Sequence, residues 1–256
     1  SRMRPHTWVR PKPLLYLAGK TVLDHALEQF TSLPALEQAE YVFIVSPNQG
    51  DQIQEHMQKV HPEKRVHFIV QEHMRGQSDA LSLARDYFNG PVLVAFSDTL
   101  IETDLSFLKD DRVDGVAWVK PMPDPRRFGV AETDANGQVI RLIEKPQDIT
   151  KNLVLVGFYY FREGQNLIAA IDEQVKRGVS LKGEYFLADA INILIEQGTK
   201  LKTKHTEVWL DAGIPEALLE TNRYLLEHGR CQCEDLKPVE GVTFIPPVSI
   251  PPDAVI

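Results

Sequence analysis

Cysteine is scarce in this chain. Its 256 residues include two cysteines, Cys231 and Cys233, with a single residue between them. That spacing is poor for a structural disulfide, and no cluster of histidines and cysteines with the spacing of a zinc site surrounds it. The low cysteine content and the lack of a signal-like segment predict a cytoplasmic protein.

The chain also lacks a net positive charge and long apolar runs. The net charge of -8 argues against a nucleic-acid partner, although a local cationic cleft for a small phosphorylated substrate remains compatible with it. No apolar run approaches the roughly 20 residues of a bilayer-spanning helix, so we expect no membrane partner. No G-x-G-x-x-G motif follows a predicted strand, which argues against a Rossmann dehydrogenase.

The chain begins with a basic, proline-rich stretch. Arg2 and Lys12 lie among Pro5, Pro11 and Pro13, and the residues between them show no helical or alternating period. This pattern predicts an irregular, stiffened loop whose separated cations would suit an extended polyanion such as a nucleoside triphosphate. A solvated basic loop without a ligand is the alternative.

Strands and helices alternate over the first hundred residues. Apolar runs predict strands at Tyr41–Val45, Val66–Val70 and Val92–Phe96. Helical spacing predicts helices at Thr21–Phe30, Asp51–Val60 and Gln77–Phe88. This alternation is typical of βαβ units in a largely parallel, doubly wound sheet, which binds ligands at the carboxyl ends of its strands.

The second half of the chain has a mixed pattern. Four further strands are predicted at Val116–Val119, Gly129–Glu132, Val139–Ile143 and Leu153–Phe161, and two helices at Glu184–Glu196 and Pro215–Glu227. Asn136-Gly137 is a strong hairpin signal between two of these strands. We therefore expect one α/β domain with a Rossmann-like mixed sheet over residues 1–229.

The last residues form a separate segment. Phe244, Ile250 and Ile256 recur every six residues, which is typical of a hexapeptide β-helix. A proline-rich extended tail is the alternative. We expect a linker and the start of a left-handed β-helix over residues 230–256, and such a tail would favour a homo-oligomer.

Several motifs together resemble those of the sugar-phosphate nucleotidylyltransferases. They are R-x-x-P-x-T from Arg2, P-K-P-L around Lys12, G-K-T-V-L from Gly19, and W-x-D-x-G before Pro215. Members of this family, such as glucose-1-phosphate thymidylyltransferase, join a sugar 1-phosphate to a nucleoside triphosphate. The family places a strand and a Gly-rich turn before this arginine, and we expect that these residues are missing from the chain.

The resemblance implies roles for five charged residues. Arg2 would steady the leaving pyrophosphate, Lys12 the α-phosphate, and Lys145 the sugar phosphate. Asp98 and Asp211 would hold Mg²⁺, an ion that prefers oxygen ligands and shares them with substrate phosphates. Without the resemblance, Asp98 reads equally well as a turn or helix cap after an apolar strand. Two departures stand beside these carboxylates, since Ser97-Asp98-Thr99 replaces G-D-N and Ile214 replaces a threonine.

The resemblance also implies a sugar site and a base site. Glu144 would bind the sugar hydroxyls, and the backbone at Gly129, Val156 and Gly157 would lie against the sugar ring. Read alone, the Glu144-Lys145 pair at a strand end is typical of a solvated turn.

Gln71 and Gly76 would read the nucleobase, because the glutamine amide offers both a donor and an acceptor. We therefore predict an Mg²⁺-dependent transfer from a nucleoside triphosphate, dTTP ahead of UTP, to glucose 1-phosphate. The rival hypothesis is a non-catalytic regulatory subunit that binds a nucleotide sugar.

Overall fold

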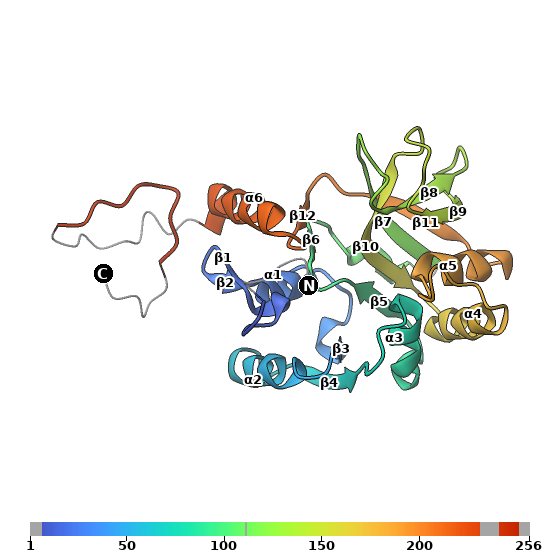
Figure 1. The fold of residues 1–256 in the computed structure, drawn as a ribbon, viewed down its shortest axis with the longest axis horizontal. Helices are drawn as coiled ribbons and strands as arrows, with labels where there is room; N and C mark the ends of the chain where they lie inside the picture. The colour runs from blue at the N-terminus through green and yellow to red at the C-terminus, as the bar shows by residue number, and fades with distance from the viewer. Residues whose placement is uncertain (1–6, 111, 231–240, 251–256) are drawn as a thin grey trace. The chain divides into compact units, whose positions relative to one another are not determined.

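The computed structural model describes residues 7–110, 112–230 and 241–250. The chain divides into two compact units, whose helices and strands are labelled in Figure 1. The first contains residues 1–31, 97–102 and 208–256, and the second contains residues 32–96 and 103–207.

A six-stranded mixed sheet forms the centre of the second unit. Its strands run in the order β11-β7-β10-β8-β9, and β5 also pairs with β10. They are β5 (Val92–Ala95), β7 (Gly115–Pro121), β8 (Gly129–Thr133), β9 (Val139–Glu144), β10 (Leu153–Phe161) and β11 (Leu201–His205). Only the β11–β7 pair is parallel, and the other pairs of this sheet are antiparallel.

Strand β10 is the best-connected strand of this sheet. One edge pairs with β7, while the other pairs with β8 at Val154 and with β5 from Phe158 to Phe161. Eight of its nine residues are buried, as expected for a strand covered on both faces. Trp118 of β7 meets Phe158 of β10 edge-on, with ring centroids 4.9 Å apart.

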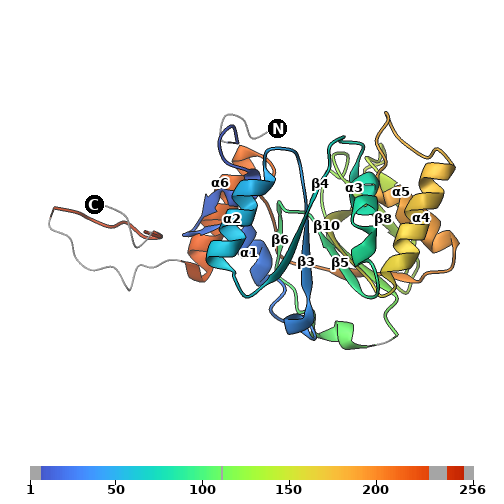
Figure 2. The same ribbon diagram turned by 90° about the horizontal axis from the view of Figure 1, so that it is seen from below.

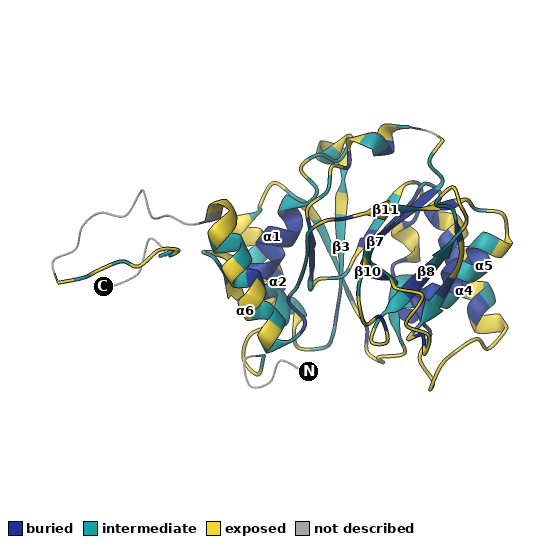
Figure 3. Ribbon diagram, turned by 90° about the horizontal axis from the view of Figure 1, so that it is seen from above, coloured by how far each residue is buried: buried dark blue, intermediate teal, exposed yellow. Residues whose placement is uncertain are grey.

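Three helices pack together beside this sheet: α3 (Gln77–Leu83), α4 (Gly164–Lys176) and α5 (Leu187–Glu196) (Figure 2). Apolar residues at helical spacing bury one side of α5, including Leu187, Ile191 and Leu194, and Figure 3 shows the buried inner and exposed outer sides. Their burial against the sheet supplies the main hydrophobic stabilisation of the unit.

A separate parallel pair completes the regular structure of the second unit. Strand β3 (Glu40–Val45) pairs in parallel with β4 (Arg65–Val70), and helix α2 (Gly50–Val60) connects them. The second unit also has the 3₁₀ turns η2 (Leu36–Gln38), η3 (Arg85–Tyr87) and η4 (Ser106–Lys109). The parallel arrangement expected for the first half is therefore met by β3 and β4, whereas β5 pairs antiparallel with β10.

The first unit combines three stretches of chain. They form η1 (Lys12–Leu14), β1 (Tyr16–Leu17), β2 (Lys20–Thr21), α1 (Val22–Glu28), β6 (Thr99–Ile101), β12 (Trp209–Asp211), α6 (Pro215–Leu225) and a π-helical turn (Leu226–Arg230). Leu17, Val22 and Ala212 form its small buried cluster, against which residues of α6 pack. Asn222 of α6 accepts a hydrogen bond from the Ala18 N–H at 2.8 Å, which ties the β1–β2 turn to the helix.

The mixed α/β fold agrees with the prediction, while the ends of several helices differ from those predicted. The helix expected over Gln77–Phe88 ends at Leu83 and is followed by the 3₁₀ turn η3. The helix expected from Glu184 begins at Leu187, because Glu184 instead bridges to Leu181. Within the described residues, no helix is long and apolar enough to cross a membrane.

The C-terminal β-helix stays a prediction. Residues 241–250 contain no strand, and the flanking residues 231–240 and 251–256, which include both cysteines and Ile256, lie outside the described residues. The predicted domain boundary after residue 229 adjoins that undescribed segment and likewise stays a prediction.

Candidate functional site

Lys12 and Asp98 form an ion pair in the first unit. Lys12 begins the 3₁₀ turn η1, with Pro11 before it and Pro13 after it. These prolines fix φ at both neighbours and hold the lysine backbone firmly. The Lys12 Nζ donates to Asp98 Oδ2 at 2.5 Å, and the two side chains are 23% and 35% exposed. Arg2, the other predicted cation of this stretch, lies outside the described residues.

Strand pairing brings the two predicted metal carboxylates to the same end of a ladder. Asp98 directly precedes β6, and Asp211 ends β12, where it lies opposite Thr99. The Ala212 N–H donates to the Asp98 carbonyl at 2.9 Å, so the ladder continues past both aspartates. Two residues 113 positions apart in sequence are thus neighbours in the first unit, as the metal hypothesis requires.

Gly213 fixes the Asp211 carboxylate. Its N–H donates to Asp211 Oδ1 at 2.6 Å. A Cβ at residue 213 would stand 2.5 Å from that oxygen, so a side chain there would displace the Asp211 carboxylate. Two carboxylates supply hard oxygen ligands, so Asp98 and Asp211 fit Mg²⁺ if substrate phosphates and water complete its coordination.

Glu144, in the second unit, faces the backbone of a glycine. It ends β9 directly opposite Gly129 of β8, and a Cβ on Gly129 would lie 3.1 Å from Glu144 Oε2. The Glu144 side chain is 20% exposed. Burial raises the pKa of Glu144, Lys145 lowers it, and the charges of Asp189 and Glu184 raise it further. Glu144 therefore belongs to an acidic, partly desolvated cluster that can accept hydrogen bonds from hydroxyl groups.

Lys145 lies at the rim of this cluster. It adopts a left-handed conformation with φ +48°, and its N–H donates to the Phe128 carbonyl at 2.9 Å. Its Nζ is 3.8 Å from Glu144 Oε1 and 4.9 Å from the centre of the Phe186 ring. The side chain is 52% exposed, so this cation remains available to an anionic ligand.

Val156 and Gly157 lie where β10 changes its neighbour from β8 to β5. The register with β7 shifts between Leu155 and Tyr159, and Gly157 has φ +80° within this irregularity. Both residues are buried, and the Gly157 carbonyl accepts from the Phe96 N–H at 3.0 Å. The glycine therefore meets a backbone requirement of the strand itself, in addition to any role toward a sugar.

Gln71 and Gly76 form a compact loop between β4 and α3. Gln71 is buried, and its Nε2 donates to Asp79 Oδ2 at 2.9 Å and to the Gly76 carbonyl at 3.3 Å. Gly76 has φ +104° and ψ 178°, a conformation essentially restricted to glycine. The described residues offer the Gly76 N–H no hydrogen-bond partner.

The predicted site residues thus fall into two groups. Lys12, Asp98 and Asp211 belong to the first unit, and the remaining described ones belong to the second. Two acidic residues absent from the predicted site stand beside members of the second group. Asp79 holds the Gln71 amide, and Asp189 raises the pKa of Glu144. The motifs named in the sequence contain neither aspartate, and an aspartate eight residues after a glutamine is unremarkable.

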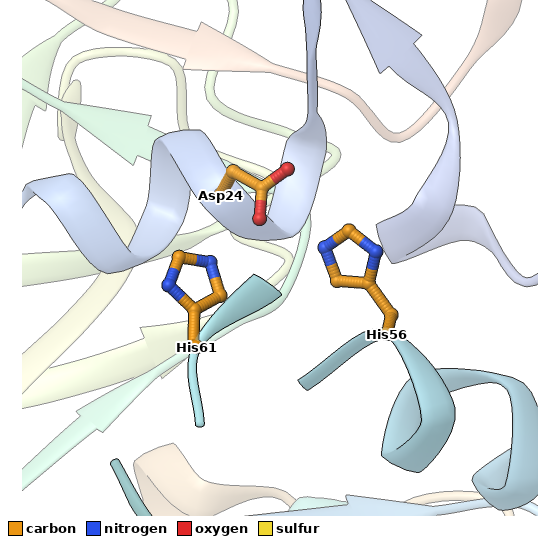
Figure 4. A group of neighbouring side chains, drawn as sticks. All are labelled: Asp24, His56 and His61. Atoms are coloured by element: carbon orange, nitrogen blue, oxygen red, sulfur yellow. The ribbon is translucent and has the colours of Figure 1, made fainter. Parts of the chain in front are cut away.

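Figure 4 draws three other polar side chains: Asp24, His56 and His61. Asp24 belongs to the first unit, where its carboxylate accepts from the Thr21 N–H at 2.9 Å and closes a capping box at the start of α1. His56 and His61 belong to the second unit, and their ring centroids are 6.2 Å apart. Asp24 already has a structural task in α1, and we assign the three no joint role.

Comparisons with known proteins agree with the motifs. A sequence model of the nucleotidyl transferase family matches residues 1–228. The bifunctional protein GlmU of Methanocaldococcus jannaschii is 34% identical over 227 residues, which are 88% of this chain and 52% of that protein. The UTP–glucose-1-phosphate uridylyltransferase AglF of Haloferax volcanii is 26% identical over 234 residues, which are 89% of this chain and 93% of AglF.

The fold is also similar to solved structures. A crystal structure from Bacillus anthracis, assigned as a glucose-1-phosphate thymidylyltransferase, superposes with a TM-score of 0.74 at 22% identity. The match covers 87% of this chain and 89% of that one. At this identity the likeness concerns the fold. The chain spans about half the length of GlmU, the relative with the highest of these identities.

Proposed function

Because the chain belongs to the nucleotidyl transferase family, we propose that it transfers a nucleotidyl group from a nucleoside triphosphate to a sugar 1-phosphate. A phosphate oxygen of the sugar 1-phosphate attacks the α-phosphorus, and the bond to the β-phosphate oxygen breaks as pyrophosphate leaves. No covalent enzyme intermediate is required, so the protein contributes positioning and charge neutralisation.

The juxtaposition of Asp98 and Asp211 beside Lys12 carries this proposal. These two carboxylates would hold Mg²⁺, which would neutralise phosphate charge and orient the reacting oxygens. Lys12 would exchange its bond to Asp98 for one to the α-phosphate, since a lysine is a mobile point charge with three donors. Arg2, at the start of the same stretch, would bind the leaving pyrophosphate.

The second group would bind the sugar and the base. Glu144 would accept hydrogen bonds from sugar hydroxyls, and Gly129 would admit the ring close to the backbone. Lys145, exposed at the rim, would bind the sugar phosphate. The Gly76 N–H and the Gln71 amide would meet the edge of the base. AglF is named for UTP and glucose 1-phosphate, and we propose a 4-keto pyrimidine triphosphate, dTTP or UTP, and glucose 1-phosphate as the pair for this chain.

The first test is pyrophosphate release with Mg²⁺, glucose 1-phosphate and each common nucleoside triphosphate in turn. We expect release above background with dTTP or UTP. Release with another pair would support the same reaction with different substrates. Binding of a nucleotide sugar without release from any pair would refute the enzyme and favour a regulatory subunit.

A lysine variant tests the division of labour. Lys145→Ala should lower kcat/KM for the sugar 1-phosphate by about 10- to 100-fold, the range expected for one charge-assisted contact. Triphosphate affinity, measured by calorimetry, should stay within about twofold of the wild type. Lys176→Ala on α4, whose lysine side chain is 81% exposed, is the matched control and should change neither. Equal losses for both substrates would refute the assignment of Lys145 to the sugar phosphate.

A further inference from the structure

Asp79 determines which way the Gln71 side-chain amide faces. Gln71 follows β4 and Asp79 lies in the first turn of α3, both within the second unit. Both side chains belong to residues that are about nine-tenths buried, at 7% and 8% exposure. The contact between them, 2.9 Å from Nε2 to Oδ2, is therefore sheltered from competing water.

The chemistry of a carboxylate permits only one orientation of this amide. Asp79 accepts hydrogen bonds and cannot donate them, so the Gln71 nitrogen must face it. The Gly76 carbonyl, which also only accepts, receives the same nitrogen at 3.3 Å. Arg75 occupies the other carboxylate oxygen at 2.7 Å and balances its charge. A flipped amide would set Gln71 Oε1 against two acceptors.

The fixed nitrogen leaves the oxygen of Gln71 available to a ligand. The described residues give Gln71 Oε1 no hydrogen-bond partner. This oxygen is also absent from the fully buried side-chain atoms without a partner, so it is accessible. The loop therefore presents an acceptor, Gln71 Oε1, together with a donor, the Gly76 N–H. A ring N–H next to a carbonyl oxygen is the complementary pattern.

We infer that Asp79 is a positioning residue for base selection, which holds Gln71 so that Oε1 accepts from a ring N–H of the nucleobase. This inference rests on the proposed function. The imide N3–H of uracil or thymine, and N1–H of guanine, satisfy Oε1. Cytosine N3 and adenine N1 are acceptors at the same ring position, and they would meet Oε1 with two lone pairs and no proton. A site of this kind rejects the mismatched base strongly because its own polar group is left unpaired.

The variant Asp79→Asn tests this inference. Asparagine has nearly the same shape, but its amide donates as well as accepts, so Gln71 becomes able to turn its nitrogen toward the base. The readout is the ratio of affinities for UTP and CTP, each titrated with Mg²⁺ by calorimetry without sugar phosphate. We expect the wild type to favour UTP by on the order of 100-fold or more. The ratio should fall by about tenfold or more in Asp79→Asn, with part of the change coming from tighter CTP binding.

Two further variants keep the test decisive. Asp79→Ala removes the acceptor altogether and should lower the same ratio, and a melting curve checks that each variant is folded. Arg75→Gln removes the other partner of Asp79 and leaves the contact to Gln71, so it should keep the ratio within about twofold. An unchanged ratio in folded Asp79→Asn and Asp79→Ala would overturn the inference, as would equal weakening of UTP and CTP.

Failure of the proposed function would look different. In that case the wild type would release no pyrophosphate with any pair of substrates. The binding ratio would still be measurable, and its response to residue 79 would still decide the role of Asp79.

Discussion

Gly76→Ala should destabilise the protein far more than an ordinary glycine substitution. An alanine at φ +104° and ψ 178° is strained by about 1–3 kcal/mol. Its Cβ would also stand 2.7 Å from the Tyr185 backbone nitrogen, and nearer still to the carbonyl oxygen. Tyr185 must then move, although its N–H donates to the Arg75 carbonyl at 2.8 Å and its carbonyl accepts from the Ser78 N–H at 3.1 Å. Losing both hydrogen bonds adds about 1 kcal/mol each, so the free energy of unfolding should fall by about 3–5 kcal/mol in total.

Gly198→Ala is the matched control for that prediction. Gly198 has φ +101°, and no heavy atom lies within 4 Å of where its Cβ would stand. The substitution therefore carries strain without a collision, and it should cost about 1–2 kcal/mol. Urea unfolding of both variants measures the difference, which we expect to be about 2–3 kcal/mol. Equal losses would show that the Tyr185 backbone places no constraint on residue 76.

Three further predictions concern pH, a helix cap and the metal. Burial raises the pKa of Glu144 above its ordinary 4.5, so the folded protein holds this proton more tightly than the unfolded chain, and the corresponding stability is lost as pH rises through the raised pKa. The melting temperature of Glu144→Gln should therefore exceed that of the wild type at pH 7, and this difference should shrink toward pH 4. A difference that stays constant with pH would contradict this cause. Thr21→Ala should cost about 1–2 kcal/mol in urea unfolding because it removes a buried capping box, and a neutral result would show that the cap is dispensable. Removing divalent ions with a chelator should abolish pyrophosphate release until Mg²⁺ is added back. The melting temperature of the substrate-free protein should shift by less than about 1 °C, because Lys12 already pairs with Asp98. A large shift would indicate a structural metal.

The sequence predicted most strands of the second unit closely, because these strands carry apolar runs. The run Leu153–Phe161 matches β10 at both ends, and the hairpin signal at Asn136-Gly137 lies between β8 and β9. Strand β11 was not predicted, since its sequence LKTKH alternates lysines on an exposed face and lacks an apolar run. Tertiary pairing with β7 makes it a strand.

The site was predicted from motifs, and its internal contacts were not. Neither the Lys12–Asp98 ion pair nor the ladder that joins Asp98 to Asp211 follows from residues more than eighty positions apart in the chain. Asp79 was missed because its importance comes from the Gln71 amide, which a helix in the next segment brings within reach. Side-chain orientation of this kind depends on packing and is invisible to spacing rules.

The division of the first unit into three stretches has a consequence for its synthesis. Its last stretch begins at residue 208, after every residue of the second unit. At about 5–20 residues per second, Lys12 leaves the ribosome roughly 10–40 s before Asp211. A nascent chain therefore carries Asp98 without its β12 neighbour while the next 113 residues, up to Asp211, are added. The second unit, which contains Glu144 and Lys145, is synthesised completely before the two carboxylates can become neighbours, because Asp211 belongs to the stretch that follows residue 207.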